Sequence, residues 1–391
     1  MMHLAILLAP LLQAQANLDP AALKNMPLRM REFTDRGEIS GIVTLVGRNN
    51  KIAALDAVGY ADIENKKPMR TDTIVQIMSQ TKSITGVAAM ILVDEGKLNL
   101  TLPAQDYLPE FKGQVVAEKA ADGSVKTHKP KHPPMVWELM CHSSGLAFLP
   151  AAGDFARINF TMDRTLADAV RAYAQENLTV EPGTKHIYSN MGIATLGRIV
   201  EVVSGKPYEV FVQERILDPL GMADSFYFPP EAKKARIAMV YMPDKDGKLT
   251  LAREKAQGGD PAAYRAGAKY PGPELAMFST ASDLYRFYQL LANRGVYGGR
   301  RILSPQAVEA MTHDYTPDRR NYGLTVSVAE GPRTLLNLVN PGLFGHGGAF
   351  GTGGWVDPKN GLVMVLLTHM VGGPTRLVRD AFWQIAESAA R

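Results

Sequence analysis

Hydrophobic and polar residues alternate early in the chain in a pattern that predicts two antiparallel strands. Residues 39–46 and 52–60 are rich in β-branched and apolar side chains, and the pair Asn49-Asn50 between them is typical of a hairpin turn. We therefore expect the folded chain to open on an antiparallel sheet.

The period then changes to that of a helix. A β-like segment at 74–78 precedes a run whose apolar positions recur every three or four residues and which ends near Gly96. The positions on the shared face are Ile84, Val87, Ala88, Ile91 and Leu92. We expect this helix to be buried on one side.

Helical patterns dominate the middle of the sequence, and strands return at its end. The segment 112–134 is rich in lysine, histidine and proline, which predicts a solvated excursion on the surface. Strands at both ends with helices between them predict an α/β (α+β) fold, in which a mainly antiparallel sheet built from both termini is flanked by helices and an all-helical lobe is inserted in the middle. The remaining predicted elements are helices at 166–177, 191–204 and 374–390, strands at 323–328 and 362–369, and a turn at 355–361.

The first sixteen residues have the features of an export signal. They contain no Lys, Arg, Asp or Glu, and an apolar run from Leu4 to Leu12 leads to Ala14-Gln15-Ala16. This run is too short to span a bilayer, and small residues at 14 and 16 are typical of a signal-peptidase site. We expect residues 1–16 to be a signal peptide and residues 17–391 to form one secreted or periplasmic unit without a membrane span. A retained hydrophobic anchor is the alternative.

Composition narrows the classes of function. Of 391 residues, 46% are hydrophobic and 21% are charged, which indicates a globular chain. The formal net charge of +4 is spread along the sequence and gives no nucleic-acid footprint, so we expect no nucleic-acid partner. Because Cys141 is the single cysteine, the chain cannot form an internal disulfide.

Two reactive side-chain pairs are better explained as structure. Cys141 is followed by His142, but neighbours in sequence rarely face each other, and the stretch closes a predicted helix at Gly145. His128 and His132 lie in the exposed segment, with a proline between them and no cluster of carboxylates nearby. We therefore expect neither a cysteine nucleophile nor a metal site, and no cofactor.

The first candidate for chemistry is Ser79-Gln80-Thr81-Lys82, at the junction between the β-like segment and the helix. A serine at the start of a helix and a lysine one turn later can share a face. Serine is a weak nucleophile until a neighbouring base takes its proton, and a buried lysine can be that base. An N-cap serine with a surface lysine is the alternative.

Two later segments add candidate groups. Tyr188-Ser189-Asn190 stands just before the helix at 191–204, where the tyrosine can relay protons and the asparagine amide can bind a substrate carbonyl. A packing tyrosine and an N-cap asparagine are the alternative. The glycine-dense run at 344–351 contains His346-Gly347-Gly348, and its backbone N–H groups can bind an oxyanion. A tight turn is the alternative there.

In this order, Ser79-x-x-Lys82, Tyr188-x-Asn190 and His346-x-Gly348 resemble the three motifs of the serine β-lactamase and penicillin-binding protein superfamily. Flanking stretches at 93–100, 142–146, 217–222 and 278–283 are similar to the class C β-lactamase branch, with its family VIII esterase and D-amino-acid peptidase relatives. The resemblance extends over most of the chain.

The resemblance implies a mechanism. Ser79 would be acylated and then freed by water, Lys82 and Tyr188 would share the proton transfers, and Asn190 would position the substrate. The backbone N–H groups of Ser79 and of Ala349, which follows Gly347 and Gly348, would form the oxyanion hole. Removing one such donor costs about 3 kcal/mol of transition-state stabilisation.

One position departs from the pattern of true β-lactamases, which usually carry lysine at the start of the third motif, where its charge attracts the carboxylate of the antibiotic. This chain has His346, and a histidine is only fractionally charged near neutrality. We expect His346 to present a partly solvated side chain to the substrate and to tune selectivity rather than chemistry.

The sequence therefore predicts a serine hydrolase that acts through a Ser-linked acyl-enzyme on small carboxylic esters, amides or D-amino-acid peptides. A β-lactamase or DD-carboxypeptidase is the runner-up. A non-catalytic acyl sensor or assembly protein is the alternative from another class, and it would acylate once and stop.

Overall fold

The computed structural model describes residues 17–119, 122–150, 162–252, 259–331 and 339–390. Its main sheet has seven strands in the order β12-β13-β14-β15-β1-β2-β3, and every neighbouring pair is antiparallel. The first strands of the chain therefore pair with its last, as the sequence predicted. The strands are β1 (Gly41–Arg48), β2 (Lys51–Asp62), β3 (Lys67–Pro68), β12 (Ser327–Val328), β13 (Phe344–Gly347), β14 (Gly353–Asp357) and β15 (Leu362–Leu367).

The predicted hairpin between β1 and β2 is confirmed. Asn49 and Asn50 both have positive φ, 54° and 62°, in the left-handed region that a tight hairpin turn requires and that asparagine tolerates. The expectation that the folded chain opens on a strand is wrong, because helix α2 (Pro20–Asp35) comes first. Asp19 accepts a hydrogen bond from the Ala21 amide and caps this helix, with proline in its first turn.

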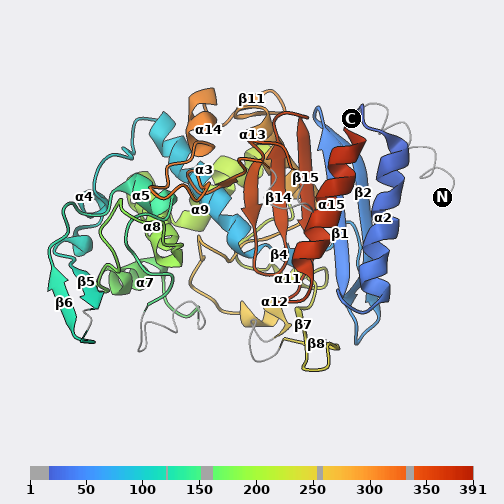
Figure 1. Ribbon diagram of the computed structural model, residues 1–391, viewed down its shortest axis with the longest axis horizontal. Helices are drawn as coiled ribbons and strands as arrows, with labels where there is room; N and C mark the ends of the chain where they lie inside the picture. Colours follow the sequence, from blue (N-terminus) through green and yellow to red (C-terminus); the bar gives the residue numbers. More distant parts are fainter. Residues whose placement is uncertain (1–16, 120–121, 151–161, 253–258, 332–338, 391) are drawn as a thin grey trace.

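Helices cover both faces of the sheet (Figure 1). Helix α2 and the C-terminal helix α15 (Thr375–Ala389) pack side by side on the outer face, where Phe33, Phe382 and Trp383 are buried against the strands. Helix α13 (Ala281–Ala292) covers the inner face together with α3 (Thr81–Asp94). The sheet is thus the middle layer of the half of the molecule that contains both termini.

A helical lobe lies beside this half (Figure 1). Helix α8 begins at Asn190 and stops at Gly205, whose φ is 71°, as predicted. Predicted segment 166–177 forms a shorter helix that ends at Tyr173. The elements of the lobe are α4 (Ala104–Tyr107), η2 (Pro109–Phe111), α5 (Val136–Met140), α7 (Leu166–Tyr173), α8 (Asn190–Ser204), α9 (Tyr208–Val212), the π-helical turn η4 (Gln213–Leu217) and α10 (Asp218–Leu220).

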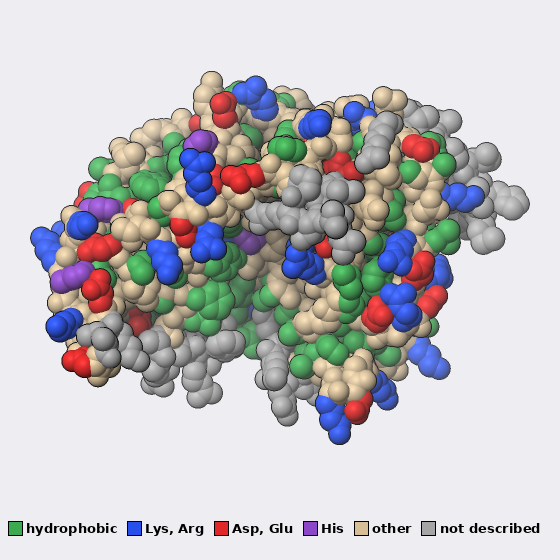
Figure 2. All heavy atoms as spheres, in the orientation of Figure 1, with side chains coloured by type: hydrophobic (Ala, Val, Ile, Leu, Met, Phe, Trp, Pro, Cys, Tyr) green, Lys and Arg blue, Asp and Glu red, His purple; other side chains and the backbone are tan. Residues whose placement is uncertain are grey.

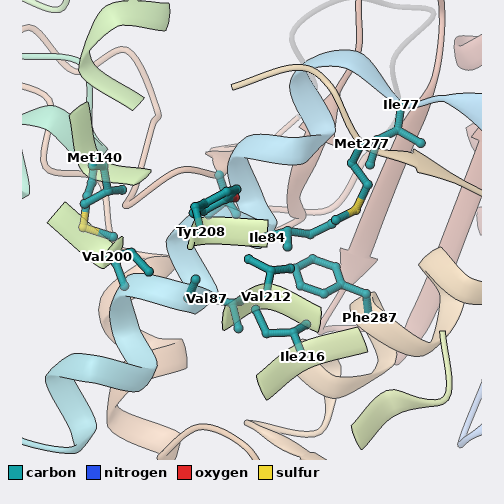
Figure 3. Packing of buried hydrophobic residues seen from close by; sticks show 14 of the residues in the cluster. Ile77, Ile84, Val87, Met140, Val200, Tyr208, Val212, Ile216, Met277 and Phe287 are labelled. Carbon is teal, nitrogen blue, oxygen red and sulfur yellow. The ribbon is translucent and has the colours of Figure 1, made fainter. Parts of the chain in front are cut away.

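Helix α3 joins the two halves and is buried on every side, not on one side as expected. All residues from Thr81 to Leu92 are buried, and Figure 3 shows Ile84 and Val87 of this helix among side chains from several other elements. The close fit depends on Gly86, because a Cβ there would lie 1.8 Å from Thr325 Oγ1. A periodic apolar face identifies a helix, but the small and polar residues on the other face do not by themselves reveal that it is covered too.

The segment 112–134 lies on the surface, as predicted, but it folds as a small hairpin of β5 (Val116–Lys119) and β6 (Val125–His128). His128 lies 3.7 Å from Glu118 and 3.6 Å from Glu181. Among the described residues, no group of three or more His, Cys, Asp or Glu side chains could hold a metal ion.

The predicted strand at 323–328 is mostly irregular, and only β12 (Ser327–Val328) has strand geometry. Thr325 has φ of 68°, which is incompatible with an extended backbone, and its amide instead binds the carbonyl of Met140. The remaining short elements are β4 (Val75–Gln76), β7 (Tyr241–Pro243), β8 (Leu249–Leu251), β9 (Phe278–Ser279), β10 (Val296–Tyr297), β11 (Arg300–Arg301), α11 (Glu231–Lys234), α12 (Pro261–Tyr264) and α14 (Pro305–Met311).

The predicted signal peptide, residues 1–16, lies outside the described residues. In the part of the chain that is described, no helix is long and apolar enough to cross a bilayer.

Candidate active site

Ser79 lies at the junction between the two halves of the molecule, in a single 3-10 turn, η1 (Met78–Gln80), that leads into α3. Met78 has φ of 50°, and a non-glycine residue in this left-handed region is strained. The side chain of Ser79 is half-buried. Figure 2 shows the surface of the molecule hollowed between the helical lobe and the sheet.

Lys82 lies one turn after Ser79 and is completely buried. Its Nζ is 3.1 Å from Ser79 Oγ, 2.8 Å from Asn190 Oδ1 and 2.8 Å from the carbonyl oxygen of Glu274. A lysine nitrogen has no more than three hydrogens to donate, so these three oxygens account for its hydrogen-bonding capacity. Two of them belong to fixed structural groups, and the third is the hydroxyl of the predicted nucleophile.

The second motif meets this pair from the start of α8. Ser189, rather than Asn190, caps the helix, because its Oγ accepts the Gly192 amide. Asn190 is therefore free to accept from Lys82. The ring centroid of Tyr188 lies 4.9 Å from Lys82 Nζ. The structure thus brings Ser79, Lys82, Tyr188 and Asn190 together, although more than one hundred residues separate the two motifs.

The third motif forms the end of β13 and the turn after it. A Cβ on Gly348 would lie 2.2 Å from the carbonyl oxygen of Ile77 and 2.2 Å from Thr352 Oγ1. Only glycine lets the turn approach the segment before Ser79 this closely. Outside regular helices and strands, we find no acceptor among the described residues for the amide of Ser79 or of Ala349. Both amides can therefore donate to an oxyanion.

His346 differs from the expectation of a partly solvated side chain. Only 6% of its surface is exposed. Its Nε2 lies 2.9 Å from the Tyr322 hydroxyl, and its Nδ1 lies 2.6 Å from the carbonyl oxygen of Gly347. Burial, followed by the charge of Lys82, lowers the pKa of His346 to about 3. The side chain is consequently neutral at physiological pH.

Two residues outside the three motifs surround Tyr188 and His346, and sequence reasoning did not select them. The ring of His142 lies 4.3 Å from that of Tyr188 between centroids, and Tyr322 hydrogen-bonds both His142 and His346. His142 stands in the flanking stretch 142–146 of the resemblance, but nothing in the local pattern at Tyr322 indicates its position.

Glu274 is a further buried group next to Lys82 that sequence reasoning missed. Its backbone carbonyl accepts from Lys82, and its carboxylate oxygens accept from the Tyr270 hydroxyl at 3.0 and 3.1 Å. Burial raises the pKa of Glu274 to about 7, against the opposing effects of its backbone hydrogen bond and of Lys82. A carboxyl group that titrates near neutrality therefore lies behind the predicted base.

Cys141 is not a nucleophile in this arrangement. Its thiol is buried within hydrogen-bonding distance of Ser143 Oγ, at 3.1 Å. Burial raises the pKa of the thiol to about 12, so that it stays protonated at neutral pH.

Comparison with known proteins agrees with this geometry. The profile of the family described as Beta-lactamase matches residues 29–388. Protein Rv1367c of Mycobacterium tuberculosis is 32% identical over 86% of this chain and 88% of its own length, and Esterase EstB of Burkholderia gladioli is 28% identical over 94% and 99%. The solved structure of EstCE1, titled as a hydrolase with promiscuous acyltransferase activity, is 25% identical, superimposes with a TM-score of 0.78 and covers 95% of this chain and 99% of that one.

Proposed function

The chain belongs to the beta-lactamase family and is a serine hydrolase that works through an acyl-enzyme, and from this premise we propose that it cleaves uncharged carboxylic esters at Ser79. The observation that carries the substrate class is the state of His346. Its side chain is buried, neutral and hydrogen-bonded through both ring nitrogens. The third motif therefore offers no cation to a substrate carboxylate, whereas the amides that would bind an ester carbonyl remain available.

Acylation begins with the proton of Ser79. Lys82 directs two N–H bonds toward Asn190 Oδ1 and the Glu274 carbonyl, so the remaining direction of its nitrogen faces Ser79 Oγ. In the neutral amine this direction holds the lone pair, which accepts the hydroxyl proton as Oγ attacks the carbonyl carbon of the ester. The negative charge that develops on the carbonyl oxygen is bound by the Ser79 and Ala349 amides.

The leaving alcohol then needs a proton, which Tyr188 supplies and recovers from Lys82. Breaking the ester C–O bond releases the alcohol and leaves the acyl group on Ser79 Oγ. Water repeats the sequence in reverse: it loses a proton to the same pair, attacks the acyl carbon and expels Ser79, whose oxygen regains its proton. Tyr188 suits this transfer because its ring lies next to the Lys82 amine. The products are a carboxylic acid and an alcohol.

A matched pair of substrates tests the proposed class. The esters p-nitrophenyl butyrate and p-nitrophenyl hemisuccinate have acyl chains of equal carbon number and differ in a terminal carboxylate. We expect a higher kcat/KM for the butyrate, and slower turnover of a chromogenic cephalosporin than of either ester. A preference for the hemisuccinate or the cephalosporin would show that the enzyme selects anionic substrates, as the β-lactamase and DD-carboxypeptidase alternatives require.

Turnover also distinguishes the enzyme from an acyl sensor. A hydrolase releases many equivalents of p-nitrophenol for each active site, whereas a sensor releases one equivalent and stops. The names of the relatives, Esterase EstB and the hydrolase EstCE1, support the enzyme and the ester class.

The proposed location of this activity is outside the cytoplasm, secreted or periplasmic, with residues 1–16 removed as a signal peptide. Small residues at Ala14 and Ala16 support cleavage at this point. N-terminal sequencing of the recovered protein should begin at Asn17. Intact Met1 on membrane-bound material would instead identify the leader as a retained anchor.

A further inference from the structure

A continuous chain of hydrogen bonds joins the second motif to the third. The amide of Ser189 lies 3.1 Å from His142 Nδ1, and His142 Nε2 lies 3.2 Å from the Tyr322 hydroxyl. That hydroxyl lies 2.9 Å from His346 Nε2, and His346 Nδ1 lies 2.6 Å from the carbonyl oxygen of Gly347. The first contact starts from a backbone donor, and the last ends on a backbone acceptor.

These two ends fix the direction of every bond between them. Because an amide can only donate, His142 Nδ1 accepts from Ser189, and its proton is on Nε2, from which it donates to Tyr322. Because a carbonyl can only accept, His346 donates from Nδ1 to Gly347, and its Nε2 accepts from the Tyr322 hydroxyl. Each histidine is therefore neutral, in a single tautomer, and the two carry their protons on different nitrogens.

The surroundings maintain this state. His142 is completely buried, and Tyr322 is 5% exposed. Burial, followed by the charge of Lys82, lowers the pKa of both histidines. The titratable groups that act on the chain are Lys82, Cys141, His186, Tyr188 and Tyr288.

The chain crosses from one wall of the site to the other. Ser189 and His142 belong to the helical lobe, at the start of α8 and just after α5. His346 and Gly347 are in β13, at the end that leads to the Ala349 amide. Tyr322 comes from the irregular segment before β12 and is the member that bridges the two walls.

We propose that His142 and Tyr322 are positioning residues, which clamp the segment carrying Tyr188 and Asn190 to the strand carrying the Ala349 oxyanion donor. Neither residue touches the reacting atoms in this role. The clamp acts by holding the proton-transfer groups and the oxyanion amide at a fixed separation across the site. The proposal rests on Ser79 being the nucleophile, but not on the preference for uncharged esters.

The backbone of His142 supports a positioning role. Its φ of 62° lies in the left-handed region, where histidine and asparagine are the more tolerated side chains. Its ring also stacks on Tyr188, at 4.3 Å between centroids and 41° between planes. One side chain thus holds the peptide after Tyr188 and the ring of Tyr188 itself.

The first test removes the bridging hydroxyl. Tyr322→Phe should lower kcat for p-nitrophenyl butyrate, and the rate of fluorophosphonate labelling at Ser79, by about tenfold or more, because small misplacements of reacting groups have effects of this size. KM should change less than twofold. Tyr315→Phe removes a hydroxyl from the same segment outside the chain and should leave both rates unchanged.

The second test uses His142→Asn, whose Oδ1 can still accept from Ser189 and whose backbone tolerates the left-handed region, but whose side chain is too short to donate to Tyr322. Because both variants break one chain, the double variant should be no slower than the slower single variant. Multiplying losses would mean that the two residues act independently and would overturn the clamp.

The third test needs no variant. In the wild-type protein, ¹⁵N spectra of the histidine rings should show His142 protonated at Nε2 and His346 protonated at Nδ1. A proton on His346 Nε2 would overturn the chain as drawn. Wild-type protein that is not labelled at Ser79 overturns the proposed function, whereas labelled wild type and equally fast Tyr322→Phe overturn the clamp alone.

Discussion

The hydroxyl of Thr352 donates a hydrogen bond to the carbonyl oxygen of Ile77 at 2.8 Å. Ile77 stands two residues before Ser79, and Thr352 follows the turn of the third motif. This bond therefore ties the oxyanion side of the site to the segment that presents the nucleophile. Gly348 lies in the same contact, since its Cα approaches both partners.

Adding one methyl group at this contact should separate the two segments. In Gly348→Ala the new Cβ would lie 2.2 Å from the Ile77 carbonyl oxygen, so the turn must move away and take the Ala349 amide with it. Loss of an oxyanion donor lowers kcat by about 100-fold or more. Gly347→Ala is the matched control, because its Cβ would meet nothing closer than 3.6 Å. Steady-state kinetics of both variants give the answer, and equal activity would contradict the assignment of the turn.

Ser79 should be the single site of acylation. Ser79→Ala is expected to lose both fluorophosphonate labelling and ester hydrolysis, because no other described hydroxyl has the Lys82 amine at 3.1 Å. Cys141→Ala should label at the wild-type rate, since the buried thiol, with its pKa raised to about 12, is protonated and unreactive. Mass spectrometry of the labelled peptide identifies the residue, and a label on Cys141 would refute the assignment.

Removing the proposed base should affect chemistry more than binding. Lys82→Met keeps the length of the side chain but has no group to accept the Ser79 proton, so kcat should fall about 100- to 10,000-fold while KM changes little. Tyr188→Phe should lower kcat within the same range. Lys185→Met replaces an exposed lysine of the same loop as Tyr188 and should be neutral. A large rise in KM with normal kcat would assign Lys82 to substrate binding instead.

The buried carboxyl group of Glu274 should make stability fall as pH rises. Its pKa is about 7 in the fold and 4.5 ordinarily, so the unfolded chain ionises first, and stability is lost between about pH 4.5 and 7. Above pH 7 the full penalty is on the order of 3 kcal/mol. Glu274→Gln removes this titration. The free energy of unfolding of the variant should therefore exceed that of the wild type at pH 8, but by less at pH 5. Denaturant titrations at the two pH values test the sign, and parallel changes in both proteins would show that Glu274 does not titrate in this range.

Local pattern predicted much of the fold and failed where contacts are distant. Asn49-Asn50 announced its hairpin because two left-handed residues in a row restrict the choice of side chain. Asp19 and Pro20 carry an equally local helix-start signal for α2, which our interpretation overlooked. The second buried face of α3 was not predictable from its period, because its cover comes from residues such as Thr325, far along the chain.

The site shows the same division. Ser79 and Lys82 are neighbours on one helix, so their spacing carries the chemistry in the sequence itself. The state of His346 depends instead on Tyr322 and on burial, neither of which leaves a local signature. Glu274 reaches Lys82 from 192 positions away. Pair contacts of this kind are set by the packed fold, so a single sequence predicts which groups react but not how each is tuned.

The pairing of β1 with β15 has a consequence for how the protein folds. Val43 stands opposite Leu367, so the central ladder of the sheet joins segments more than three hundred residues apart. While the chain is being synthesised, β1 and β2 can form a hairpin, but their inner edge has no partner until the last strand is complete. Closing so long a loop is slow, and an unpaired edge invites association with other chains. We expect the nascent protein to depend on chaperones late in synthesis, and truncation before Leu362 to abolish folding rather than trim an edge, because the lost strand is internal to the sheet.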